Sequence, residues 1–170
     1  MRLFVALNFD KDTVDSLCRL QSLLRDNNVE GNYTKLQNLH MTLAFIGEYG
    51  NPDDVLEVLE EVPFRSMSIR FSEVYIYREM CLLSIERNPG LESYVRRLRR
   101  ALAEKGIPFD RKNFKPHITL VRKAVLKNGL PENLLKDSGL SATYADKVSL
   151  MQSTFGKNGM IYTEMGVISS

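Results

Sequence analysis

Two segments of the chain repeat one short pattern, and this repeat constrains how the chain can fold. The segments NLHMTLAFIG and PHITLVRK each contain the tetrapeptide His-x-Thr-Leu, which begins at His40 and at His117. Both tetrapeptides lie in apolar runs with the two-residue alternation of a β-strand. A short polar helix pattern and a long strand pattern follow each of them, over residues 40–77 and 117–155. The sequence therefore predicts two similar half-domains that face each other across a cleft.

The rest of the chain alternates between strand and helix patterns. Strand patterns cover RLFVALN, SMSIRFSEVYIYR, MCLLSIE and two closing segments, TYADKVSLMQSTF and MIYTEMGVI, which GKNG joins. Helix patterns cover residues 12–25, the segment after GNPDD, residues 91–105 and a short stretch near PENLLKD, and NNVEGN is expected to form a turn. Asp10 or Asp12 is expected to cap the first helix. Strands joined by short turns as well as by helices indicate an α+β fold with mostly antiparallel pairing.

The composition is that of an ordinary globular protein, with 170 residues, 44% hydrophobic and 26% charged. Cys18 and Cys81 lie in apolar patterns, so we expect two reduced core thiols. The two histidines and two cysteines show no zinc-ligand spacing, so no metal is expected. No apolar run approaches the roughly 18 residues of a membrane span, and the first residues lack a signal-peptide pattern. We therefore expect a cytoplasmic protein without membrane contact.

The positive charges are distributed unevenly along the chain. Residues 1–90 hold nine Lys or Arg against fourteen Asp or Glu, whereas residues 91–170 hold fourteen against seven. The basic side chains gather in RRLRR, from Arg96 to Arg100, and again over residues 111–127. This bias suits a phosphate-bearing partner that binds mostly to the second half. For RRLRR itself, a solvated helix face is the favoured alternative.

The repeated tetrapeptide places chemically useful side chains together. Side chains two residues apart on a strand share a face, so His40 lies beside Thr42 and His117 beside Thr119. Two imidazoles across a cleft can act as acid and base near neutral pH, and two hydroxyls can bind the oxygens of a phosphodiester. A single strand histidine is more often a hydrogen-bonded core residue. Both histidines of the chain lie in this pattern, which favours the catalytic interpretation.

The segments NLHMTLAFIGE and FKPHITLVRK, with the opening MRLFVALNF, resemble the 2H phosphoesterase superfamily. Within it, the chain is most similar to the RNA 2′,3′-cyclic phosphodiesterases, which were first described as 2′-5′ RNA ligases. The resemblance covers nearly the whole chain. It implies one bilobal domain over residues 1–170, with two mostly antiparallel sheets related by pseudo-twofold symmetry, helices packed outside and an active site between the lobes.

The resemblance also implies roles for six residues. His40 would be the proton donor, His117 the proton acceptor, and Thr42 and Thr119 would hold the phosphate. Arg122 resembles the arginine that neutralises the phosphate, and Phe45 resembles an aromatic that stacks on the terminal base. Simple alternation places these last two side chains opposite their histidines, so they reach the cleft only if each strand ends, twists or bulges. Otherwise they are a surface arginine and a core phenylalanine.

The implied reaction is hydrolysis of a terminal RNA 2′,3′-cyclic phosphate to a 2′-phosphate, with reversible 2′-5′ ligation as a side activity. We expect a monomer that needs no cofactor. RNA 3′ ends bearing that cyclic phosphate are the implied partner. Two alternatives stay open. The same machinery could act on a small cyclic nucleotide or an ADP-ribose cyclic phosphate, or the cleft could bind RNA or nucleotides without catalysis.

Overall fold

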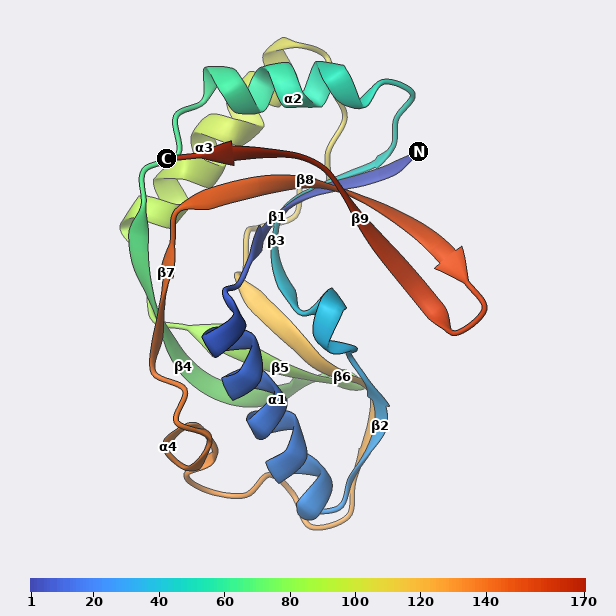
Figure 1. The fold of residues 1–170 in the computed structure, drawn as a ribbon, viewed down its shortest axis with the longest axis vertical. Helices are drawn as coiled ribbons and strands as arrows, with labels where there is room; N and C mark the ends of the chain where they lie inside the picture. Colours follow the sequence, from blue (N-terminus) through green and yellow to red (C-terminus); the bar gives the residue numbers. More distant parts are fainter.

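The structure is a computed structural model that describes residues 1–170 (Figure 1). The strands are β1 Arg2–Asn8, β2 Val29–Tyr33, β3 His40–Glu48, β4 Met67–Tyr77, β5 Met80–Ile85, β6 His117–Leu126, β7 Ala142–Ala145, β8 Lys147–Gly156 and β9 Gly159–Ser169. The α-helices are α1 Lys11–Asp26, α2 Pro52–Glu61, α3 Pro89–Glu104 and α4 Leu134–Ser138, and η1 Leu36–Asn38 is one turn of 3₁₀-helix.

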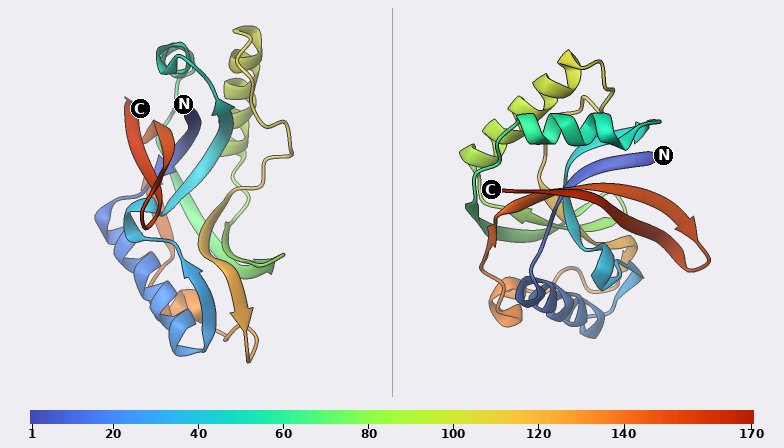
Figure 2. Two further views of the ribbon diagram at one scale, coloured as in Figure 1. Left: turned by 90° about the vertical axis from the view of Figure 1, so that its right-hand side faces the viewer. Right: turned by 45° about the horizontal axis from the view of Figure 1, so that its top comes forward.

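The strands form an antiparallel arrangement in the order β7-β4-β5-β6-β3-β1-β8-β9, and β2 pairs with residues 121–126 of β6, beyond the residue that pairs with β3. This confirms the predicted α+β fold with mostly antiparallel strands. The two expected sheets are continuous through a single pair of residues, Met41 of β3 and Ile118 of β6. We call β1, β3, β8 and β9 the first lobe, and β2 with β4 to β7 the second lobe. Figure 2 shows the strands of the two lobes diverging on either side of this junction.

The helices pack on the outside of the two lobes. Helices α2 and α3 contact each other and strands β3, β8 and β9, whereas α1 and α4 contact strands β2, β4 and β6. Figure 1 shows the first pair in the upper half of the view and the second pair in the lower half. One cluster of 35 buried hydrophobic residues includes side chains from both lobes, so the lobes share a core. None of the helices is long and apolar enough to cross a membrane.

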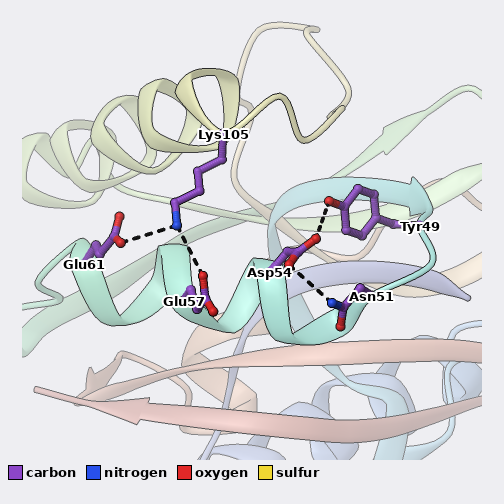
Figure 3. A network of polar contacts seen from close by, with 6 residues as sticks. All are labelled: Tyr49, Asn51, Asp54, Glu57, Glu61 and Lys105. Atoms are coloured by element: carbon purple, nitrogen blue, oxygen red, sulfur yellow. Dashed lines mark hydrogen bonds and ion pairs between the residues drawn. The ribbon is translucent and has the colours of Figure 1, made fainter.

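Side-chain hydrogen bonds and the ion pairs of one lysine stabilise helices α1, α2 and α3. Asp10 accepts a hydrogen bond from the backbone N–H of Thr13 at 2.9 Å, which confirms one of the two expected caps of α1. At α2, Asp54 accepts bonds from the hydroxyl of Tyr49 and from the amide of Asn51. Lys105, directly after α3, contacts Glu57 at 3.2 Å and Glu61 at 3.5 Å on α2 (Figure 3). These polar contacts join α2 to α3 and to the loop that follows β3.

The structure differs from two of the predicted elements. The segment NNVEGN forms a turn only at its start, where Asn28 has a positive φ of 63°, and then enters strand β2. Its polar composition resembles a turn, but pairing with β6 satisfies its backbone groups and buries Val29. The predicted strand TYADKVSLMQSTF is two strands that change partner at Asp146. Strand β7 pairs with β4 in the second lobe, and β8 pairs with β1 and β9 in the first.

Both cysteines are free thiols, as the sequence predicts. Cys81 is fully buried in β5, and burial raises its pKa to about 11. Cys18 lies on α1 and is partly buried, and burial also raises the pKa of its thiol. At neutral pH both side chains are therefore protonated and act as small apolar residues.

Candidate functional site

The two motif strands meet at the centre of the molecule. Because β3 and β6 pair antiparallel through Met41 and Ile118, one step along each strand sets His40 opposite Thr119 and Thr42 opposite His117. Met41 and Ile118 are completely buried, so the other four side chains share the opposite face. Directly opposed residues of an antiparallel pair have Cβ atoms about 5 Å apart. The register thus gathers both motifs around one local pseudo-twofold axis.

Both motif strands contain a bulge directly after the threonine. On β3, Thr42 pairs with Ala6 and Ala44 pairs with Val5, so Leu43 is an extra residue. On β6, Thr119 pairs with Leu82 and Val121 pairs with Cys81, so Leu120 is an extra residue. Each bulge shifts the alternation by one residue. Phe45 and Arg122 are consequently exposed on the same face as the histidines, at equivalent positions of the two motifs.

Neighbouring segments satisfy the carbonyl groups around these bulges. The carbonyl of Leu120 accepts hydrogen bonds from the backbone of Thr34 at 3.0 Å and from the side chain of Gln21 at 3.1 Å. Gln21 lies on α1 and is only 4% exposed. On the first lobe, the carbonyl of Phe45 accepts a bond from the N–H of Asp110 at 2.8 Å. These bonds satisfy backbone carbonyl groups at or close to each bulge.

The six residues that the resemblance singles out line one cavity of about 1240 Å³ between the lobes. They come from only two strands, β3 and β6. The remaining lining residues come mainly from β1, β2, η1 and the β8–β9 hairpin. The structure therefore brings together every site residue that the sequence predicts: His40, Thr42, Phe45, His117, Thr119 and Arg122.

The two imidazoles are oriented in the same way. Nδ1 of His40 lies 2.7 Å from the carbonyl oxygen of Asn38, and Nδ1 of His117 lies 2.7 Å from that of Lys115. A carbonyl can only accept, so each Nδ1–H donates and each Nε2 is left for other partners. Nε2 of His40 lies 2.9 Å from the hydroxyl of Thr42, which donates to it when the ring is neutral.

His40 is the more enclosed of the two imidazoles. The ring centroids of Phe4 and Tyr162 lie 5.0 Å and 5.2 Å from the centroid of His40. Burial lowers the pKa of His40, and the positive charges of Arg122 and His117 lower it further, whereas the bond to the Asn38 carbonyl opposes this shift. In the free protein the environment therefore favours the neutral ring, which a bound anion would counteract.

Four cationic side chains line the cavity, namely Arg2, Arg25, Lys35 and Arg122. None of them forms an ion pair with a carboxylate, and Asp110 is the only acidic residue in the lining. Three of these four cations belong to the first half of the chain, so the cationic lining does not come mostly from the more basic second half. The overall charge bias does not describe the site, because folding selects individual side chains from both halves.

The basic segment RRLRR is not part of the cavity. It lies on α3, where Arg97 donates a hydrogen bond to the carbonyl of Pro63 and Arg99 donates to that of Lys112. Arg96 and Arg100 are exposed on the outside of the helix. The favoured interpretation of this segment, a solvated helix face, agrees with the structure.

Sequence reasoning missed several lining residues. Phe4 and Tyr162 enclose His40, and Arg2 and Phe155 extend the cavity along the first lobe. Arg2 and Phe4 lie in the opening segment MRLFVALNF, which the resemblance includes. The residues of the β8–β9 hairpin carried no sequence signal, because only tertiary packing brings that hairpin to the cavity.

Two imidazoles, two hydroxyls and an arginine around one space can bind a tetrahedral anion and transfer protons on two sides of it. The structure contains no group of three or more His, Cys, Asp or Glu side chains that could hold a metal ion. The fold and the two histidine motifs define the class of the protein as a 2H phosphoesterase.

The chain belongs to the 2′-5′ RNA ligase superfamily, whose family model matches residues 14–146. It is 30% identical to an RNA 2′,3′-cyclic phosphodiesterase of Aquifex aeolicus over 81% of each chain. It is 27% identical to an RNA 2′,3′-cyclic phosphodiesterase of Methanothermobacter thermautotrophicus, over 98% of this chain and 97% of the relative.

Solved structures show the same fold. The crystal structure of E. coli LigT with 3′-AMP superposes with a TM-score of 0.82 at 21% identity, covering 99% of this chain and 97% of LigT. A Thermus thermophilus protein superposes with a TM-score of 0.78 at 24% identity, covering 99% of this chain and 97% of that protein. The whole chain, including the β8–β9 hairpin, thus takes part in a fold that is known from solved structures.

Proposed function

We propose that this phosphoesterase hydrolyses the 2′,3′-cyclic phosphate at an RNA 3′ end to a 2′-phosphate. The observation that carries the proposal is the register of β3 and β6, which sets each motif's histidine opposite the other motif's threonine on the face that lines one cavity. The names of the curated relatives support RNA cyclic phosphate as the substrate class.

In the proposed reaction, the neutral Nε2 of His117 accepts a proton from water as the water oxygen attacks phosphorus. The bond between phosphorus and the 3′ oxygen breaks, and the protonated Nε2 of His40 donates its proton to that oxygen. The product is a 2′-phosphate with a free 3′-hydroxyl. A 5′-hydroxyl in place of water would give a 2′-5′ phosphodiester, which is the proposed basis of ligation.

His40 must be protonated to act as the acid. Burial and nearby positive charge lower its pKa in the free protein. The substrate phosphate brings negative charge beside the ring, which favours the imidazolium. The bond from Nδ1–H to the Asn38 carbonyl stabilises that charged form as well.

The other four side chains bind the substrate in this proposal. Thr42 and Thr119 donate hydrogen bonds to the non-bridging oxygens, and Arg122 neutralises the negative charge that the phosphate carries. Phe45, which is 52% exposed at the equivalent position of the first motif, stacks on the terminal base. Stacking on an aromatic ring accepts any base, so the site would not depend on RNA sequence.

The test uses a short RNA that ends in a 2′,3′-cyclic phosphate, with EDTA present, and a separation that resolves 2′- from 3′-phosphate product. Wild-type protein should give the 2′-phosphate. His40→Ala and His117→Ala should each lose about 10²- to 10⁴-fold in rate, the usual contribution of one acid or base. Full activity in either histidine variant would reject the proposed catalytic pair.

Threonine variants test the proposed hydrogen bonds to the phosphate and include a matched control. Thr42→Val and Thr119→Val remove a hydroxyl that faces the cavity, whereas Thr163→Val removes an exposed hydroxyl on β9 outside it. Only the first two should reduce turnover. Faster turnover of a cyclic mononucleotide than of RNA would favour a small cyclic phosphate as substrate. Tight binding without turnover would favour a binding module.

A further inference from the structure

The cavity continues past Phe45 to a second exposed aromatic ring that the proposed reaction does not use. Phe155 is 84% exposed, the largest value among the exposed large hydrophobic residues. It lies on β8, two residues before the turn of the β8–β9 hairpin, and it lines the same cavity as the two histidines. The ring is therefore open to a ligand that binds in the cavity.

A cationic side chain lies between the two aromatic rings. Phe45 pairs with Phe4 on β1, and Phe4 pairs with Met151 on β8, so Phe45 and Phe155 are two strands and four residues apart. With standard strand spacings this separation is about 16 Å along the sheet. Arg2 pairs with Ser153 on the intervening strand, which sets its Cα about 8 Å from the Cα of each phenylalanine. Phe45, Arg2 and Phe155 thus form a diagonal stripe across three adjacent strands.

The stripe is available to a ligand and is held in place. Arg2 forms no ion pair and no side-chain hydrogen bond within the protein. Two contacts tie the hairpin to the segment before His40. Lys35 Nζ donates to the carbonyl of Asn158 at 2.6 Å, and the side chain of Asn38 donates to that of Met160 at 3.0 Å. Phe155 is therefore presented by an anchored hairpin and not by a free loop.

We propose that this stripe binds RNA upstream of the terminal nucleotide. Phe155 stacks on an upstream base, and Arg2 neutralises a phosphate between that base and the terminal one. Alternating aromatic and cationic side chains are how proteins hold single strands without reading their sequence. This subsite rests on the proposed function and extends it, since it makes a single-stranded oligonucleotide, and not a mononucleotide, the preferred substrate.

The experiment compares kcat/KM for a cyclic 2′,3′-mononucleotide with kcat/KM for a four-nucleotide RNA that ends in the same cyclic nucleotide. In wild-type protein the RNA should be favoured, and the readout is the ratio of the two values. Phe155→Ala should reduce this ratio by about 5- to 100-fold, the usual effect of losing one stacked base. Phe155→Tyr should retain the ratio, because a tyrosine ring also stacks.

Two further variants complete the test. Ile161→Ala is the matched control, since Ile161 is a half-exposed apolar residue of the same hairpin that does not line the cavity. It should leave the ratio unchanged. Arg2→Gln should reduce the ratio and weaken its dependence on salt, because one phosphate contact is lost. A wild-type ratio near one, or equal losses on both substrates in Phe155→Ala, would overturn the proposed subsite.

Binding separates this proposal from the proposed reaction. If wild-type protein turns over neither substrate, the proposed reaction fails. Fluorescence anisotropy with a labelled four-nucleotide RNA bearing a 3′-phosphate then tests the subsite alone. Weaker binding by Phe155→Ala than by Ile161→Ala supports the stripe, and equal binding by the two variants refutes it.

Discussion

Gly31 is expected to contribute strongly to the stability of the second lobe, although it lies outside both histidine motifs. It lies at a register shift where it alone faces two residues of β6, Lys123 and Ala124, and its φ is +149°. A Cβ at this position would lie 2.8 Å from the carbonyl oxygen of Arg122 and 2.9 Å from that of Lys123. Both contacts are to backbone atoms, which cannot rotate away as a side-chain tip can. Gly31→Ala should therefore push β2 away from β6.

The magnitude follows from two costs. A non-glycine residue in this backbone region costs about 1–3 kcal/mol. Forcing a methyl group into a closely packed site costs about 1–3 kcal/mol more. The expected loss is about 2–6 kcal/mol, a large part of the 5–15 kcal/mol typical of a whole domain. Because Arg122 lines the cavity, the surviving folded protein should also lose activity.

The assay is equilibrium unfolding in urea, with the free energy of unfolding extrapolated to water. Gly129→Ala is the matched control, because Gly129 has a φ of +71° but no atom within 4 Å of the added Cβ. It should lose about 1–2 kcal/mol from backbone conformation alone. If Gly31→Ala loses no more than Gly129→Ala, the two carbonyl contacts do not restrain β2 and the reasoning is refuted.

Two predictions concern His40. The pKa of His40 is lowered in the folded protein from the ordinary histidine value of 6.5. At a pH just below 6.5 the unfolded chain therefore binds more protons than the folded protein does. The free energy of unfolding should decrease as the pH falls through this range. His40→Gln should reduce this decrease in pH-dependent denaturation, and an identical pH dependence would contradict the environment described for the ring. A cyclic substrate with sulfur in place of the 3′ oxygen has a leaving group that needs no proton. It should restore turnover to His40→Ala but not to His117→Ala, and the opposite pattern would exchange the acid and the base.

The sequence predicted much of this fold and site because their signals are local. Strand alternation around His40 and His117 placed each threonine on the face of its histidine. Helix patterns with nearby capping residues located the four helices to within a few residues. The alternation of apolar and polar residues that defines these elements is local and does not depend on contacts with distant segments.

The missed features all depend on partners that are distant in the chain. Strand β2 forms because β6 continues beyond its single pair with β3 and offers residues 121–126 as partners, and β7 separates from β8 because the two strands pair in different lobes. The bulges at Leu43 and Leu120 are visible only in the register against β1 and β5. No local pattern indicates which residue a partner strand will skip.

The sequence by itself determined the two motifs, the pairing of a histidine with a threonine in each, and the class of chemistry that such side chains can perform. Only the tertiary structure decided that the motifs pair through Met41 and Ile118, that Phe45 and Arg122 face the cavity, and that the hairpin carrying Phe155 extends it. The physical reason is the range of the interactions. Side-chain alternation acts over a few residues, whereas strand register is set by hydrogen bonds and burial between segments far apart in the chain.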